Sequence, residues 1–293
     1  MRICRFNGDR LGIVQDGEVF DVTSVLERLP PQRYPLPRHD LFIEALPQLL
    51  EPLRQAMQGA RRHALADVRF ASPVANPGKI IGAPINYQAH VEESKANQAI
   101  GHGRNITSIG DWGLFLKAGS SLIGCDQDIV LRFPERRNDH EVELGVVIGS
   151  TCRQVRREDA LGHVAGYAVA LDMTLRGTEF QCFRKSIDSY SVLGPWMVTT
   201  DEIADPHQLD LWIKVNGEMR QQSNTRHLVY DIGRLIEFAS SFYTLHPGDV
   251  IMTGTPEGVG PVKPGDVLEV GIEQVGGFTI RIAPEYAHAP ATA

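Results

Sequence analysis

Alternating apolar and polar residues fill the first 30 positions of the chain. Gly beside Asp or Asn interrupts the alternation at Asn7-Gly8-Asp9 and at Asp16-Gly17. Alternation broken by such dipeptides is typical of tight turns between antiparallel strands. We therefore expect small antiparallel strands at the start of the chain.

A helical spacing of apolar residues follows between positions 40 and 65, with polar and basic residues among and after them. The pattern predicts a helix over this stretch, interrupted near Pro47 or Pro52 because proline lacks the amide hydrogen that a helix interior uses. Its apolar positions are Leu41, Phe42, Ala45, Leu46, Leu49 and Leu50.

Proline-bearing segments at Ser72-Pro73 and Asn76-Pro77-Gly78 then interrupt the chain. Because the residue before proline avoids the helical conformation, we place a domain boundary there. The prediction is a small N-terminal α+β domain over residues 1–72, a larger domain over 73–285 and a flexible tail over 286–293.

Beyond the boundary the chain consists of many short apolar or alternating segments separated by Gly, Pro and Asp. Residues 231–241 form the clearest helical pattern. So many turns favour an α+β, β-rich fold in which sheets fold over one another, rather than a parallel sheet wound with helices. The expected strands are 79–81, 114–117, 141–148, 167–171, 196–199, 211–215, 250–252, 267–272 and 278–282.

Composition narrows the classes of function. The formal charge of −7 argues against nucleic acid as a partner, because such binding depends on neutralising phosphates. No apolar run is long enough to cross a bilayer and the first ten residues do not resemble a secretory signal, so we expect a cytoplasmic protein. The four cysteines form no CxxC pair, which argues against a zinc knuckle or a redox motif.

Two carboxylates stand two residues apart at Glu141 and Glu143, within an otherwise apolar segment. The two-residue period of a strand puts both on one face, where like charges destabilise each other unless water or a cation lies between them. One interpretation is a metal site. The other is the solvent-facing edge of an antiparallel sheet.

A third carboxylate, Asp172, ends the apolar run 166–171 abruptly. Taken singly, it is also compatible with an Asp that caps the following turn. Three carboxylates without cysteine suit a hard cation bound through oxygen, namely Mg²⁺, Mn²⁺ or Ca²⁺.

Five segments occur in the order that resembles the fumarylacetoacetate hydrolase family. They are residues 86–93, 139–144, 166–172, 193–196 and 253–260, and the resemblance spans about residues 79–282. It implies a mixed β-sandwich roll with a small N-terminal domain, and a catalytic domain that commonly forms a homodimer.

The same resemblance implies roles for individual residues. Glu141, Glu143 and Asp172 correspond to the metal ligands of the family. His90, Glu93 and Lys185 correspond to catalytic groups: a base that deprotonates water, its carboxylate partner, and a lysine that supports the developing oxyanion or supplies a proton. Positions near the substrate are Tyr87, Lys117, Arg176, Gln181 and Thr255.

His90 and Glu93 also stand out without the resemblance, because residues three apart share one face of a helical turn. A surface histidine beside an acid is the alternative interpretation. Residues 94–110 are polar and contain glycine, as expected of a lid over bound substrate. The chain departs from the family pattern at Glu179, where Gln is frequent, and in the short linker between Asp172 and Lys185.

The expected reaction is hydrolysis of a carbon–carbon bond in an acylpyruvate-type 1,3-diketo acid such as fumarylpyruvate or maleylpyruvate. A divalent cation would stabilise the enolate, and the His–Glu pair would activate the water. Decarboxylation of oxaloacetate-like acids and isomerisation or hydration of unsaturated 2-oxo dioic acids use the same logic and remain alternatives. A non-catalytic metal- or ligand-binding protein is the alternative of another class. No GxSxG, GxxxxGK[ST] or GxGxxG motif occurs, which disfavours serine hydrolases, NTPases and dinucleotide enzymes.

Overall fold

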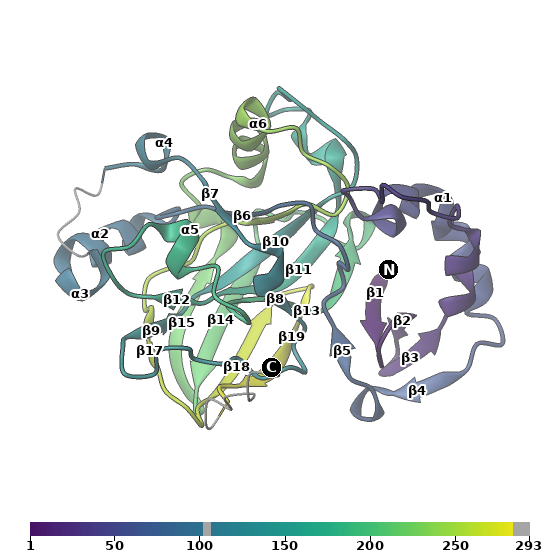
Figure 1. The fold of residues 1–293 in the computed structure, drawn as a ribbon, viewed down its shortest axis with the longest axis horizontal. Coiled ribbons are helices and arrows are strands. Elements are labelled where there is room, and N and C mark those ends of the chain that lie inside the picture. Colours follow the sequence, from purple (N-terminus) through teal and green to yellow (C-terminus); the bar gives the residue numbers. More distant parts are fainter. Residues whose placement is uncertain (102–106, 284–293) are drawn as a thin grey trace.

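The computed structural model describes residues 1–101 and 107–283. A mixed twelve-stranded sheet runs through the molecule, and its strands pair in the order β4-β3-β2-β1-β13-β11-β10-β16-β6-β7, with β5 beside β1 and β8 beside β13. Most neighbours are antiparallel, while β6 pairs with β16 and β8 with β13 in parallel. Two smaller sheets, β12-β9-β17 and β15-β14-β18-β19, lie beside it (Figure 1).

The strands of the large sheet are β1 (Arg2–Phe6), β2 (Arg10–Gln15), β3 (Glu18–Asp21), β4 (Arg62–Ala64), β5 (Phe70–Ala71), β6 (Ile80–Gly82), β7 (Phe115–Lys117), β8 (Leu122–Ile123), β10 (Val142–Ile148), β11 (Val164–Asp172), β13 (Ser191–Thr199) and β16 (Val250–Met252). The smaller sheets contain β9 (Asn138–His140), β12 (Thr174–Leu175), β14 (Asp210–Val215), β15 (Glu218–Asn224), β17 (Gly260–Val262), β18 (Val267–Ile272) and β19 (Gly276–Arg281). The α-helices are α1 (Leu41–Ala56), α2 (Gln88–Ala96), α3 (Gln98–Gly101), α4 (Ile109–Trp112), α5 (Gln181–Arg184) and α6 (Ile232–Phe242). Short 3₁₀ turns are Thr23–Arg28, Leu65–Asp67, Gly119–Ser121, Ala160–His163, Thr200–Glu202 and Thr225–His227. Among the described residues, no helix has the length and apolar character that crossing a membrane requires.

The β-rich architecture expected from the sequence is present. Every expected strand overlaps an observed one, and the helix expected at 231–241 is α6, which Asp231 caps through its side chain. The N-terminal strands form hairpins as expected. They also join the large sheet, because β1 pairs with β13 through Arg2 opposite Val198. The boundary at residue 72 stays a prediction, and the tail 286–293 lies outside the described residues.

The expectation for residues 40–65 is wrong in two respects. Helix α1 runs without a break through Pro47 and Pro52, and the chain turns into strand β4 after it rather than remaining helical. An interior proline costs about 3 kcal/mol, whereas each fully buried apolar side chain contributes about 1.5–3 kcal/mol. The side chains that α1 buries, Ile43, Leu46, Leu49 and Leu53, therefore offset the local cost.

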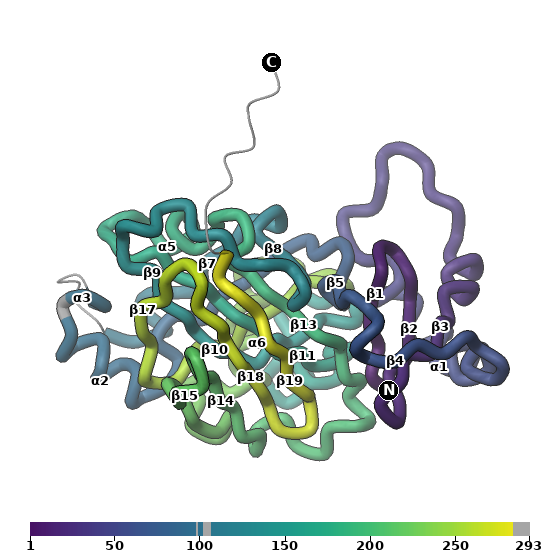
Figure 2. Tube along the Cα trace, turned by 90° about the horizontal axis from the view of Figure 1, so that it is seen from below, coloured from purple at the N-terminus to yellow at the C-terminus, as the bar shows by residue number. Residues whose placement is uncertain are grey.

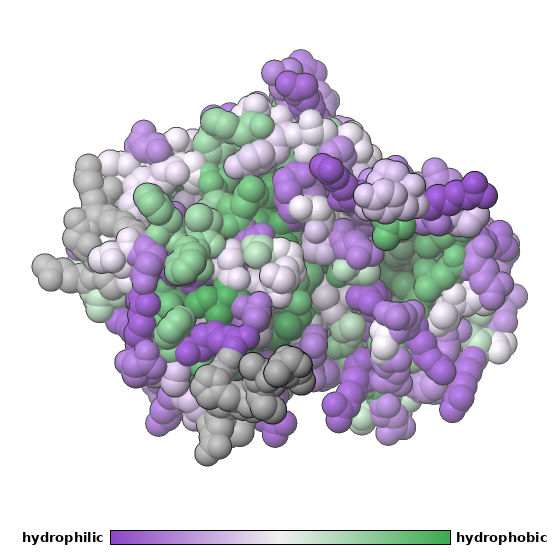
Figure 3. All heavy atoms as spheres, in the orientation of Figure 1, coloured by the Kyte–Doolittle hydropathy of each residue, from purple (hydrophilic) through white to green (hydrophobic). Residues whose placement is uncertain are grey.

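Opposite faces of the central strands belong to two different cores. In β10, Leu144 and Val146 pack into the core that includes the four-stranded sheet and α6. Val147 of β10 and Ala170 of β11 face the other way, into the core that includes α1. Figure 2 shows α1 and the first strands on one side of the molecule, apart from the α2–α3 side. In Figure 3, apolar side chains line the space between α1 and strands β1–β3. Because both faces of β10 are covered, a polar side chain on it lies in the interior.

Candidate active site

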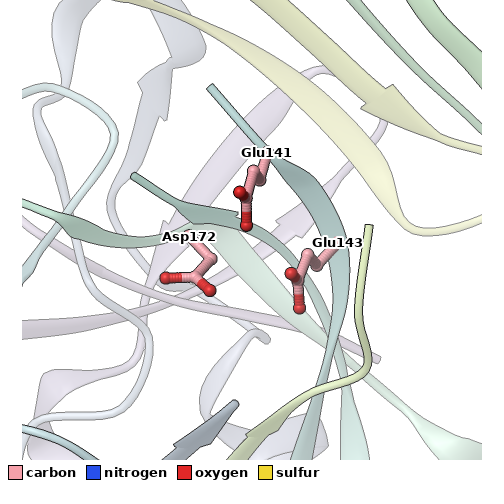
Figure 4. Close-up of side chains that lie close together, drawn as sticks. All are labelled: Glu141, Glu143 and Asp172. Atoms are coloured by element: carbon pink, nitrogen blue, oxygen red, sulfur yellow. The ribbon is translucent and has the colours of Figure 1, made fainter. Parts of the chain in front are cut away.

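Three carboxylates converge where β10 begins and β11 ends. One oxygen atom from each of Glu141, Glu143 and Asp172 lies within 4.8 Å of the others, and Figure 4 shows the three side chains directed toward a common point. All three residues are buried, with exposed fractions of 4%, 2% and 1%. The alternative of a solvent-facing sheet edge is therefore wrong.

The antiparallel register explains this convergence. Val142 pairs with Leu171 and Glu143 with Ala170, so Asp172 lies opposite Glu141, whose carbonyl accepts its N–H at 3.0 Å. Side chains opposite each other on one face of a sheet are close neighbours, and Glu143 follows on that same face. Its carboxylate accepts the Gly254 N–H at 2.7 Å.

Buried cations surround two of these carboxylates. Lys185 Nζ lies 2.6 Å from both Glu141 Oε2 and Asp172 Oδ2. Lys117 Nζ donates to Asp172 and to the carbonyl of Tyr190. Arg176 donates to Glu141 at 2.9 Å and to Asp139 at 2.7 Å. Lys117, Lys185 and Arg176 are each less than one tenth exposed, so these ion pairs are shielded from water.

The electrostatic balance differs between the two glutamates. Burial disfavours the charged form of Glu141, but Lys185 and Arg176 hold its pKa well below the usual range. Burial together with the Asp172 and Glu141 carboxylates raises the pKa of Glu143 well above its usual value. Burial also lowers the pKa of Lys117, against the attraction of Asp172. Negative charge at Glu143 is thus the part of the cluster that the protein compensates least, because the Gly254 N–H and the charge of Lys185 oppose the rise in its pKa without preventing it.

A hard dication fits this arrangement. Its preferred ligands are carboxylate oxygens, and an ion bound at about 2.1–2.4 Å joins oxygens up to about 4.2–4.8 Å apart. Glu143 forms no ion pair with the lysines or arginines that the structure describes, so a cation next to it would offset the burial and the repulsion that together raise its pKa. Glu141, Glu143 and Asp172 are the residues that would hold the ion.

His90 and Glu93 share one face of a helical turn, as expected from their spacing. Both are in α2, and His90 Nδ1 is 2.8 Å from Glu93 Oε2. The second oxygen of Glu93 accepts the Gly258 N–H at 3.0 Å. His90 is buried, with an exposed fraction of 5%, so the alternative of a surface histidine does not hold. His90, Glu141 and Glu143 together line a cavity of about 50 Å³.

The remaining expected site residues are not all in this cavity. Arg176, Gln181, Lys185 and Thr255 line it. Lys117 reaches the cluster through Asp172. Tyr87 does not line it: its ring is fully buried, its hydroxyl has no hydrogen-bond partner among the described residues, and the residue borders a separate hollow.

Several residues that line or support the cavity are not predicted from the sequence. Arg184 and Trp112 line the cavity, and Gln221 supports the strand that carries the glutamates. Arg184 directly precedes Lys185, and this position in the sequence could have indicated that Arg184 belongs to the site. Gln221 lies in a polar hairpin strand that gave no signal at all. Glu179, where the chain departs from the family pattern, pairs with Arg136 at 2.9 Å. Part of the expected lid, residues 102–106, lies outside the described residues.

Comparison with known proteins places this geometry in a family. Residues 79–283 match the model of the fumarylacetoacetate (FAA) hydrolase C-terminal domain. The chain is 56% identical over 284 residues to the maleylpyruvate hydrolase of Aquipseudomonas alcaligenes, covering 96% of this chain and 99% of that protein. It is 36% identical over 298 residues to a 2,4-didehydro-3-deoxy-L-rhamnonate hydrolase of a Sphingomonas species, covering 94% of each.

A solved structure agrees along nearly the whole chain. The crystal structure of the maleylpyruvate hydrolase from Sphingobium sp. SYK-6 in complex with manganese(II) and pyruvate superposes with a TM-score of 0.83 at 41% identity. The superposition covers 97% of this chain and 99% of that one. With the matched domain, the shared fold and the buried carboxylate cluster, the chain belongs to the fumarylacetoacetate hydrolase family.

Proposed function

We propose that this chain is a metal-dependent hydrolase that cleaves an acylpyruvate-type 1,3-diketo acid, with maleylpyruvate or fumarylpyruvate as the first candidates. The observation that carries the proposal is a buried histidine, paired with a carboxylate, that lines the same cavity as two of the three converging carboxylates. The similarity to maleylpyruvate hydrolases supports it.

The proposed metal ligands are Glu141, Glu143 and Asp172, with Mg²⁺ or Mn²⁺ as the ion. When bound, such a dication supplies Lewis acidity to the adjacent oxygens of the 2-keto acid. The manganese in the related Sphingobium structure supports this assignment. The chain contributes a preformed, water-poor set of charges that binds the keto-acid end of the substrate.

His90 is the proposed base. A carboxylate only accepts hydrogen bonds, so the contact with Glu93 puts the proton of the neutral ring on Nδ1 and leaves the lone pair on Nε2. Nε2 then takes a proton from water. Glu93, fixed by the Gly258 N–H, stabilises the imidazolium that results.

The bond changes balance with water as the only co-reactant. Hydroxide from water adds to the acyl carbonyl carbon, the bond between this carbon and the methylene of the pyruvate part breaks, and the methylene gains a proton. The products are a carboxylic acid and pyruvate. We assign the delivery of that proton to Lys185, whose buried ammonium bridges Glu141 and Asp172. Thr255, Arg176 and Gln181 line the cavity and are the proposed substrate contacts, and Lys117 supports Asp172.

A substrate panel tests the proposal. Purified protein with Mn²⁺ or Mg²⁺ is incubated with maleylpyruvate, fumarylpyruvate, acetylpyruvate and oxaloacetate, while enol absorbance, pyruvate and CO₂ are measured. Pyruvate released in step with enol loss from the acylpyruvates supports hydrolysis. Release of CO₂ from oxaloacetate alone would point to decarboxylation, and Mn²⁺ binding without turnover of any substrate would point to a binding protein.

We also propose that the protein forms a homodimer in the cytoplasm. All four cysteines are free thiols, as is usual in a reducing compartment. Phe180 and Phe183 expose 85% and 74% of their surface around α5, and a partner subunit would cover such side chains. Light scattering coupled to size-exclusion chromatography measures the mass in solution, and a monomer of 32.4 kDa would refute the dimer.

A further inference from the structure

Val142, the residue between two of the proposed metal ligands, lacks a strand neighbour on one side. On the other side β10 pairs with β11 along its whole length. Toward β16 the pairing begins only at Gly145, preceded by a single bond from Thr253 N–H to the Leu144 carbonyl. The N–H and C=O of Val142 point to this open side, where buried backbone groups need other partners.

Side chains of Gln221 and Thr255 fill the place of the missing strand. The Val142 N–H donates to Gln221 Oε1 at 3.1 Å, and Gln221 Nε2 donates to Thr255 Oγ1 at 2.8 Å. The Thr255 hydroxyl then donates to the Val142 carbonyl at 2.9 Å. These three contacts form a closed ring around a single residue of β10, and both Gln221 and Thr255 are almost fully buried.

The orientation of the Gln221 amide is fixed by its surroundings. Nε2 also lies 2.7 Å from the Pro256 carbonyl, which only accepts hydrogen bonds. A flipped amide would place its oxygen against that carbonyl and its NH₂ against the Val142 N–H. Oε1 further contacts Nδ1 of the buried His140 at 3.2 Å, so it receives a second donor. Gln221 therefore holds the backbone of Val142 and the side chain of His140, the two neighbours of Glu141.

The strand that carries Gln221 is shaped for this contact. In the β14–β15 pair, Ile213 lies opposite Gln221 and Lys214 opposite Met219, which leaves Arg220 as an extra residue. Such a bulge redirects the side chains beside it. The next residue, Gln222, is exposed on the outer face of the same hairpin.

We infer that Gln221 is a positioning residue, which sets the spacing of Glu141 and Glu143 through the hydrogen-bonded ring at Val142. The inference rests on the proposed metal site. It differs from a general packing role because the ring acts on the peptide units that join the two ligands. Partners that orient metal ligands typically change metal affinity by about 10–100-fold when removed.

Metal affinity without substrate gives the direct test. Isothermal titration of Mn²⁺ into metal-free protein should show that Gln221→Met raises the Kd by about 10-fold or more, with an altered Mn²⁺ electron paramagnetic resonance spectrum. Gln222→Met, one residue away on the exposed face, should match the wild type in both. An unchanged Kd and spectrum in Gln221→Met would overturn the inference, even if its Tm fell.

A pair of variants at Thr255 keeps the test decisive if Gln221→Met does not fold. Thr255→Ser keeps the hydroxyl and therefore the ring, whereas Thr255→Val breaks it. Weaker Mn²⁺ binding by the valine variant alone supports the inference, and equal binding by the two variants contradicts it. Wild-type protein that binds no Mn²⁺ would instead refute the proposed function on which the inference rests.

Discussion

His90 and Glu93, one turn apart on α2, are joined by a contact of 2.8 Å between Nδ1 and Oε2. Glu93 is held in turn by the Gly258 N–H, which comes from the loop between β16 and β17. The proposed base, His90, is thus oriented by Glu93, and Glu93 is itself anchored by a backbone N–H of the domain that contains the three carboxylates. This arrangement separates the groups proposed to act on water from those that would hold the metal.

His90→Ala should therefore lower kcat for acylpyruvate hydrolysis by ~10²-fold or more, because the proton acceptor is lost. The Kd for Mn²⁺ should stay close to that of the wild type, since His90 is not among the proposed ligands. Glu92→Gln is the matched control, since Glu92 lies on the exposed face of the same helix. Steady-state kinetics with titration calorimetry measures both quantities, and wild-type turnover in His90→Ala would remove the residue from the mechanism.

Glu141→Gln and Glu143→Gln should act oppositely on the metal-free protein, although both should weaken Mn²⁺ binding. Glu141 is bonded to Lys185 and Arg176, so its replacement removes one of the two carboxylate partners of each buried cation and costs about 3 kcal/mol. Such a loss corresponds to a fall in Tm of about 5 °C. Glu143 is repelled by its neighbours, so its replacement should leave Tm unchanged or raise it. Thermal unfolding in EDTA at pH 7 compares the two, and a larger fall for Glu143→Gln would contradict the charge balance described above.

Gly258→Ala should inactivate the enzyme by displacing the partner of Glu93. Gly258 has a φ of +91°, and a Cβ atom there would lie 2.1 Å from the Arg220 carbonyl oxygen. A shift of about 1 Å in a supporting residue can lower the rate by ~10²-fold. Gly265 has the same φ, and a Cβ atom there would meet nothing within 4 Å. Gly265→Ala is therefore the control that introduces backbone strain without a steric contact. Similar kcat values for the two variants would show that the steric contact with Arg220 does not lower the rate.

Thiol reactivity should distinguish Cys182 from the other cysteines. Burial raises the pKa of Cys4 to about 12 and that of Cys152 to about 11, and it raises the pKa of Cys125 as well. Because the thiolate is the reactive form, a raised pKa means less reaction at pH 8. Cys182 is exposed. Mass spectrometry after brief maleimide treatment of native protein should find one label, at Cys182, and none in Cys182→Ser; rapid labelling of Cys4 would contradict the fold.

The sequence by itself determined the local relationships in this protein. The two-residue period of a strand put Glu141 and Glu143 on one face, and the helical turn put His90 beside Glu93, because both relationships follow from backbone geometry alone. The β-rich body was equally readable, since turn residues mark the ends of its strands. The break expected in α1 is absent because the apolar side chains that α1 buries in the core offset the local cost of its prolines, and the local sequence pattern does not show that burial.

Only the tertiary structure decided that Asp172 stands opposite Glu141, because strand register depends on which residues bury together across the sheet. It also decided that this face of β10 is enclosed, so the two like charges lie together in the interior, where a bound cation would relieve their repulsion. Gln221 comes from a hairpin far along the chain, and nothing local marks its amide as the partner of Val142. Contacts between distant segments depend on how the whole chain packs, and the local pattern of residues along the sequence does not specify that packing.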